Sequence, residues 1–174
     1  MRVSAVIVAA GRGARMGAAE NKVFLPLLGT PILVRTVAAF AGVGEVSEIV
    51  VVVRDGEEGK AAALLSSDGA GRVRIVRGGA ERRDSALAGV RAATGDFVLI
   101  HDAARPLVTA ELIGRVLEGT VSQGACVPVI PAVDTLRRVD GAGHLAPPVV
   151  ERAGLVNVQT PQGFRTDIIR RCLE

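Results

Sequence analysis

Short runs of apolar residues recur along the chain, and segments with helical spacing of apolar and polar positions separate them. The runs are short and rich in β-branched residues, which is typical of strands buried on both faces of a parallel sheet. We expect strands at residues 3–8, 48–53, 72–76, 96–100 and 125–129. The repetition of strand and helix predicts a doubly wound, mostly parallel α/β sheet of Rossmann-like type with right-handed crossovers.

The segments between these runs predict helices at residues 31–40, 55–66, 81–93, 111–121 and 167–173. Thr30 followed by Pro31 is typical of a capped helix start with a first-turn proline, and Thr109 and Thr166 are further candidates for N-caps. The polar residues 66–71 are predicted to be a loop. The last helix has about two turns, which is short, so the chain is either naturally short or a fragment of a longer domain.

The pattern changes towards the C-terminus, where two extended segments flank a glycine-rich turn, at residues 133–139, 140–143 and 144–150. Such a pattern predicts a β-hairpin. Pro147 and Pro148 lack the N–H groups that a ladder needs, so the hairpin lies at an edge or projects. We define residues 131–159 as a β-arm within a single domain, 1–174. A projecting hairpin either seeks a partner or is an ordinary surface hairpin.

The composition agrees with a single α/β domain. Of the 174 residues, 49% are hydrophobic but only 2% are aromatic, so the core must consist of Val, Ile, Leu and Ala. The net charge of +3 suits anionic ligands and is too small to indicate nucleic-acid binding. Single-stranded nucleic-acid binders also use stacking aromatic residues, which are scarce here.

Two cysteines, Cys126 and Cys172, are more simply reduced thiols than a disulfide framework. The N-terminal segment lacks the apolar stretch and cleavage site of a signal peptide. No run reaches the ~18 apolar residues of a membrane span. The default expectation is therefore a cytoplasmic protein.

A glycine-rich segment follows the first predicted strand. Residues 9–17 read AAGRGARMG, and Asn21-Lys22 follows after a short polar gap. Glycines let backbone N–H groups approach phosphate oxygens, and Arg15 and Lys22 can neutralise their charge, which indicates a nucleoside triphosphate site. A P-loop would end in Gly-Lys-Ser/Thr, and a dinucleotide fingerprint would have glycine in place of Met16. The alternative is a glycine-rich turn with surface arginines.

The segment that follows the strand at 96–100 carries an acid and a base, in the sequence His101-Asp102-Ala103-Ala104-Arg105-Pro106. At the carboxyl edge of a parallel sheet, Asp102 would face the same crevice as the glycine loop. Its carboxylate could orient ribose hydroxyls or water around magnesium, or it could form a structural ion pair with Arg105. His101 is better explained as a packed, hydrogen-bonded residue at the strand end than as a catalyst.

A third motif, GGAERRDS at residues 78–85, also follows a strand and opens a helix. Its glycines permit close backbone approach, and Ser85 could hydrogen-bond a base edge. The alternative is a glycine-rich cap with a solvated charge cluster. The sequence shows no zinc-ligand spacing and no Ser/His/Asp set.

Together, AAGRGARMG with Lys22, GGAERRDS and VLIHDAARP resemble the 2-C-methyl-D-erythritol 4-phosphate cytidylyltransferases of the non-mevalonate isoprenoid pathway. Further similar segments are Asp134-Thr135, Glu151-Arg152 and Thr160-Pro161-Gln162. The first glycine loop is shared with many sugar nucleotidyltransferases, whereas the HDAARP segment is specific. The resemblance implies a nucleotide-diphospho-sugar transferase fold, transfer of CMP from CTP to methylerythritol phosphate, Mg²⁺ bound mainly through the CTP phosphates, and a homodimer joined through the β-arm.

The resemblance also implies roles for individual residues. Arg15, Lys22 and Arg152 would be catalytic, the first two by stabilising the pentavalent phosphorus. The implied CTP-binding residues are Ala9, Ala10, Gly11, Gly13, Gly79, Ala80, Ser85, Asp102 and Ala103. The implied acceptor-binding residues are Asp102, Arg105, Thr135 and Arg152, with Arg152 reaching across the dimer. No protein ligand to a metal is implied.

The chain departs from the family in two respects. Family members continue past Glu174, and Ala80 stands where an acidic residue is often found. Three alternatives follow: a ribitol 5-phosphate cytidylyltransferase, a truncated non-catalytic nucleotide-binding or dimerisation module, and a dinucleotide-dependent oxidoreductase. Met16 and the spacing of Lys22 disfavour the last.

Overall fold

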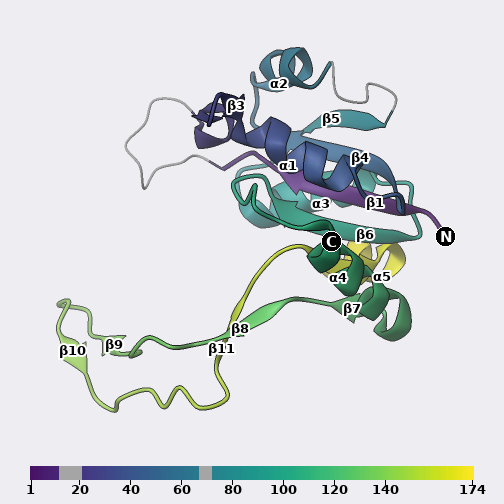
Figure 1. Cartoon of the computed structure of the whole chain (residues 1–174). Coiled ribbons are helices and arrows are strands. Elements are labelled where there is room, and N and C mark those ends of the chain that lie inside the picture. The colour runs from purple at the N-terminus through teal and green to yellow at the C-terminus, as the bar shows by residue number, and fades with distance from the viewer. Residues whose placement is uncertain (12–20, 67–71) are drawn as a thin grey trace.

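The computed structural model describes residues 1–11, 21–66 and 72–174, and it has a six-stranded mixed sheet at its centre (Figure 1). The strand order is β5-β4-β1-β6-β12-β7. The bounds are β1 Val3–Val8, β4 Val46–Val53, β5 Val73–Arg77, β6 Phe97–Asp102, β7 Ala125–Cys126 and β12 Gln162–Arg165. The pairs between β5, β4, β1 and β6 are all parallel, which confirms the expected α/β sheet.

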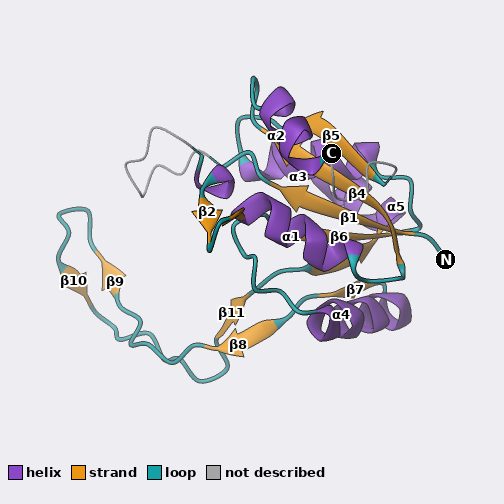
Figure 2. Ribbon diagram, turned by 45° about the horizontal axis from the view of Figure 1, so that its top comes forward, coloured by secondary structure: helices purple, strands orange, loops and turns teal. Residues whose placement is uncertain are grey.

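Helices cover both faces of this sheet, as a doubly wound fold requires (Figures 1 and 2). Side chains from α1, α2 and α4 pack on one face, and those from α3 and α5 pack on the other. The bounds are α1 Ile32–Ala41, α2 Glu58–Leu65, α3 Arg82–Ala92, α4 Ala110–Gln123 and α5 Thr166–Leu173. All five predicted helices are therefore present.

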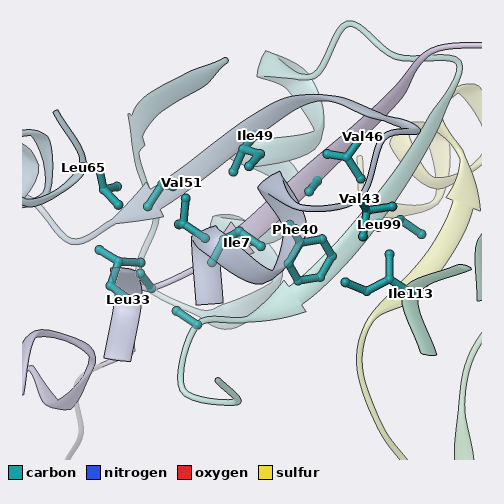
Figure 3. Packing of buried hydrophobic residues seen from close by; sticks show 14 of the residues in the cluster. Ile7, Leu33, Phe40, Val43, Val46, Ile49, Val51, Leu65, Leu99 and Ile113 are labelled. Atoms are coloured by element: carbon teal, nitrogen blue, oxygen red, sulfur yellow. The ribbon is translucent and has the colours of Figure 1, made fainter. Parts of the chain in front are cut away.

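The strand β1 is buried on both sides because its successive side chains point to opposite faces. Ile7 belongs to the cluster under α1 and α4, whereas the neighbouring Val6 belongs to the cluster under α3. Phe40 of α1 is fully buried and lies among Ile7, Leu99 and Ile113 in the larger cluster (Figure 3). Continuous apolar runs in the sequence thus correspond to strands with two covered faces.

Three details of the predicted elements are wrong. The run 125–129 is not one strand, because β7 ends at Cys126 and β8 (Val129–Pro131) pairs outside the main sheet with β11 (Val156–Val158). Thr30 does not cap α1, since residues 30–31 form β3, which pairs with β2 (Pro26–Leu27). Thr166 is the first residue of α5 rather than its cap, and its hydroxyl donates to the Gly95 carbonyl at 2.8 Å.

The predicted hairpin is present and projects from the body of the molecule (Figure 2). Its paired strands, β9 (Arg138–Val139) and β10 (Leu145–Ala146), are shorter than expected. Asp140 closes the turn by accepting hydrogen bonds from two backbone N–H groups, at 2.9 and 2.8 Å. The arm exposes Val133, Val139, Leu145 and Val149, each at least 60% accessible.

The predicted loop at 66–71 lies mostly outside the described residues. Among the described residues, no helix combines the length and the apolarity needed to cross a membrane. The expected N-cap Thr109 is confirmed, because its side chain accepts a hydrogen bond from the Leu112 N–H at 3.2 Å.

Close packing of α3 on the sheet depends on Gly89. A Cβ at this position would lie 2.3 Å from Val6 Cγ1 and 2.9 Å from Val52 Cγ2. We expect Gly89→Ala to lower the free energy of unfolding by about 1–3 kcal/mol through overpacking, as measured by urea denaturation. The control is Gly114→Ala in α4, where a Cβ meets nothing within 4 Å. That change should raise stability by about 0.5–1 kcal/mol, and equal effects at both positions would contradict the packing argument.

Candidate functional site

A cavity of about 630 Å³ lies at the carboxyl ends of the parallel strands. The loops that follow β1, β5 and β6 line it together with the 3₁₀ helix η2 (Lys22–Phe24). This is the edge at which ligands bind in open α/β sheets. The structure brings nine of the predicted site residues to this cavity: Ala9, Ala10, Gly11, Lys22, Gly79, Ala80, Ser85, Asp102 and Arg105.

The remaining predicted residues lie elsewhere. Ala103 is fully buried and does not line the cavity, and its carbonyl accepts a hydrogen bond from the Thr36 hydroxyl at 2.8 Å. Thr135 and Arg152 belong to the projecting arm and do not line the cavity. Gly13 and Arg15 lie outside the described residues.

The loop after β5 is folded tightly against the start of α3. A Cβ at Gly79 would lie 2.3 Å from the Cβ of Asp84, so this position needs glycine. Ser85 is 2% exposed, and its hydroxyl oxygen accepts the Gly79 N–H at 3.2 Å. Glu81 and Asp84 form a capping box at the helix start. The paired glycines therefore bring the loop backbone and Ser85 together on one wall of the cavity.

Asp102 lies between two arginines at the cavity rim. Its Oδ1 accepts from Arg82 Nη2 at 2.9 Å, and its Oδ2 accepts from Arg105 Nε at 3.3 Å. The Arg105 guanidinium also donates to the side-chain oxygen of Gln159. The ion pair considered for Asp102 and Arg105 thus forms, and it forms within the cavity. Sequence reasoning missed Arg82 as a site residue, although it lies inside the GGAERRDS motif.

His101 is hydrogen-bonded to the backbone of Arg105, which belongs to this rim. Its ring is fully buried, with the centroid 5.0 Å from that of Phe40. Nε2 lies 3.1 Å from the Arg105 carbonyl oxygen, which can only accept, so Nε2 carries a proton. Nδ1 lies 2.9 Å from the Thr160 hydroxyl, which donates to it. Burial lowers the pKa of His101, which favours this neutral form. Its expected packed, hydrogen-bonded position is confirmed.

The described residues of the site offer few ligands for a metal ion. The described residues contain no group of three or more His, Cys, Asp and Glu side chains placed to hold a metal ion. Two carboxylates, Glu81 and Asp102, line the cavity. Mg²⁺ commonly binds through one or two carboxylates, water and substrate phosphates, so this set suits an ion that a nucleotide brings with it.

Cys126 and Cys172 are free thiols, as expected.

An α/β sheet with a small-residue loop, a lysine and an acid held by arginines at its carboxyl edge is typical of a nucleotide-binding protein. The fold is that of the nucleotide-diphospho-sugar transferases. Residues 3–174 match the family described as 2-C-methyl-D-erythritol 4-phosphate cytidylyltransferase. The chain belongs to this family.

Individual relatives are similar over nearly the whole chain. The cytidylyltransferase of this name from Acidobacterium capsulatum is 41% identical over 182 residues, covering 98% of this chain and 76% of the relative. That from Nocardia farcinica is 44% identical over 170 residues, covering 97% and 73%. The crystal structure of the enzyme from Thermus thermophilus superposes with a TM-score of 0.77 at 37% identity, covering 98% and 74%. The chain thus spans about three quarters of the length of these relatives.

Buried neutral His101 links stability to pH. Because its pKa in the folded protein lies below the ordinary value of 6.5, the unfolded chain binds the proton more readily. Neutral His101 therefore makes its full contribution to the free energy of unfolding above pH 6.5. Below pH 6.5, the free energy of unfolding falls as the pH drops towards the folded-state pKa of His101, by at most about 1.4 kcal/mol per pH unit. Urea denaturation between pH 5 and 8 should show this slope in the wild type and lose it in His101→Gln. Parallel curves for the two proteins would contradict the assignment.

Proposed function

We propose that this chain transfers CMP from CTP to 2-C-methyl-D-erythritol 4-phosphate, giving 4-diphosphocytidyl-2-C-methyl-D-erythritol and pyrophosphate. The observation that carries the proposal is the convergence of three family motifs on one cavity, where Lys22, Ser85 and Asp102 lie together. Membership of the cytidylyltransferase family over residues 3–174 supports the same conclusion. In this reaction an oxygen of the acceptor phosphate attacks the α-phosphorus of CTP, and pyrophosphate leaves.

The nucleotide end of the cavity is built mainly from backbone. Ala9, Ala10 and Gly11 follow β1, while Gly79 and Ala80 follow β5. Their small side chains leave N–H and C=O groups accessible to the cytosine ring and the nearby phosphates. In this proposal Ser85 and Gly13 also bind CTP.

Lys22 and Arg15 are proposed to stabilise the pentavalent phosphorus. An acceptor phosphate oxygen is already anionic, so the reaction needs no strong general base. It needs cations that reduce the repulsion between two anions and hold them in line. Lys22 lines the cavity on η2, next to the backbone that would hold the phosphates.

Asp102 and Arg105 are proposed to bind the acceptor. A carboxylate suits polyol hydroxyls, whereas a guanidinium suits a phosphate. The contact with Asp102 and the hydrogen bond to Gln159 hold the Arg105 guanidinium at the rim. Arg82 adds a second cation on the opposite side of the same carboxylate.

Mg²⁺ is proposed to bind mainly through the CTP phosphates, where it would offset negative charge. Asp102 is a cavity carboxylate that could accept hydrogen bonds from its water ligands. Because Asp102 is shared between two arginines, its capacity for direct coordination is reduced.

The β-arm is proposed to join two chains in a homodimer. Its exposed side chains Val133, Val139, Leu145 and Val149 provide apolar surface of the kind that marks an interface. In this proposal Thr135 and Arg152 position the acceptor phosphate, and Arg152 reaches from one protomer into the site of its partner. The Arg152 guanidinium donates to the Val133 carbonyl, which ties the two sides of the arm together.

The acceptor assay tests the proposed reaction. With CTP and Mg²⁺, we expect pyrophosphate release that depends on methylerythritol phosphate, and we expect kcat/KM for ribitol 5-phosphate to be at least about tenfold lower.

Lys22→Ala should lower turnover by about 10²–10³-fold, as expected for the loss of one transition-state donor, and should leave Tm unchanged. Equal use of both acceptors, no turnover with either, or full turnover by Lys22→Ala would contradict the proposal.

Mixing two inactive variants tests the shared site. In a heterodimer of Lys22→Ala and Arg152→Ala, one site carries both changes and the other carries neither, provided that Arg152 acts across the interface. After subunit exchange we expect about one quarter of wild-type turnover, because half of the dimers are mixed and each has one intact site. No recovery in a verified mixed population would place Arg152 in its own protomer's site.

A further inference from the structure

Asn21, which directly precedes Lys22, is a buried polar residue to which no role in the reaction has been assigned. Its side chain is 2% exposed, yet both ends of its amide are hydrogen-bonded. Nδ2 donates to the Ala9 carbonyl at 2.8 Å and to Glu57 Oε2 at 3.0 Å, and Oδ1 accepts from the Val23 N–H at 3.4 Å. One side chain thus contacts the end of β1, the start of η2 and the residue before α2.

These contacts join the two parts of the cavity that would hold phosphates. Ala9 opens the loop after β1 and is itself fixed by its N–H to the Val52 carbonyl, at 2.7 Å. Lys22 belongs to η2, and Asn21 is the N-cap of this helix. The Asn21 side chain is hydrogen-bonded both to Ala9 and to Val23 of η2, so it connects the helix that carries Lys22 with the loop after β1.

A second layer holds Asn21 in turn. Glu57 accepts from Asn21 with one carboxylate oxygen and from the Arg54 guanidinium with the other, at 3.1 Å from Nε. Arg54 directly follows β4, and the Arg54 carbonyl accepts the Glu57 N–H at 3.0 Å. A continuous set of hydrogen bonds therefore runs from the end of β4 through Glu57 and Asn21 to the end of β1.

The chemistry of this arrangement requires an amide. Two acceptors, a carbonyl and a carboxylate, face Nδ2, and one donor faces Oδ1. A carboxylate of the same shape would lose both donated bonds and would place negative charge beside Glu57. Leaving a buried polar group unsatisfied is unfavourable, and the loops can relieve this penalty by moving apart.

We propose that Asn21 is a positioning residue, which holds Lys22 at the correct distance and angle from the phosphate-binding backbone through its bonds to Ala9, Val23 and Glu57. The inference rests on the proposed role of Lys22 in the transfer reaction. Asn21 itself does not touch the reacting atoms in this scheme. Asn21 affects the rate by fixing the position of Lys22.

The test compares Asn21→Asp, Lys22→Ala and the double variant by steady-state kinetics. We expect Asn21→Asp to lower kcat by about 10–100-fold, since small displacements of a catalytic group have effects of this size, and to change the KM for CTP less than about threefold. If Asn21 acts through Lys22, the double variant is no slower than Lys22→Ala alone. Wild-type kcat in Asn21→Asp, or multiplied losses in the double variant, would overturn the inference.

The matched control is Ser4→Ala, at the opposite end of β1. Ser4 is also fully buried, and its hydroxyl donates to Glu48 at 2.6 Å and accepts from Gly95 N–H at 2.9 Å. Ser4→Ala should lower Tm but leave kcat within about twofold, because the contact lies far from the cavity. An equal loss of kcat in Ser4→Ala would show that the rate follows stability, which would overturn the inference.

Two further comparisons separate the possible failures. If Asn21→Asp does not fold, Glu57→Ala decides, because it keeps the Asn21 amide and removes one acceptor. We expect about fivefold lower kcat, and wild-type kcat in folded Glu57→Ala would overturn the inference. Full turnover by Lys22→Ala would instead refute the proposed role of Lys22, and the inference would fail with it. Slow Lys22→Ala with fast Asn21→Asp would refute the inference alone.

Discussion

Parallel pairing of β1 with strands on both sides is the constraint on which the site depends. Val8 lies opposite Val52 in β4 and opposite Asp102 in β6. The ladder continues one residue beyond the strand, where the Ala9 N–H donates to Val52 and the Ala103 N–H donates to Val8. The loops after β1 and β6 therefore start side by side. Without this register, the backbone at Ala9 and the carboxylate at Asp102 would not face one cavity.

Apolar packing and buried polar contacts have different roles in this arrangement. Apolar burial is not directional, so it brings the helices to the sheet without fixing the loops at its edge. Hydrogen bonds are directional, and buried ones must be satisfied. Asn21, Ser85 and His101 are each at most 2% exposed, and each bonds a backbone group of a loop beside the cavity. The core thus determines the fold, while these three side chains hold the backbone of loops beside the cavity.

The sequence predicted the parallel strands and the site at their ends, because burial on both faces requires continuous apolar runs and parallel strands end at one edge. It did not predict β12 (Gln162–Arg165), because this strand is short and its residues are mixed in polarity. The apolar run 125–129 looked like one strand, but β7 ends at Cys126 and β8 begins at Val129. Arg82 could not be distinguished from its neighbour Arg83, since only the tertiary fold places one at Asp102 and the other at the Leu173 carbonyl.

The charges that line the cavity explain why the proposed reaction needs additional cations. Lys22, Arg82 and Arg105 are positive, whereas Glu81 and Asp102 are negative, so the described lining carries one net positive charge. A nucleoside triphosphate and an acceptor phosphate together bring several negative charges into this space. Their mutual repulsion rises in a site that excludes water, because the effective dielectric constant falls. A metal ion on the phosphates and an arginine from a partner's arm would each supply positive charge that the described lining lacks. The proposed magnesium ion and the proposed arginine from a partner would thus both offset the negative charge of the two substrates.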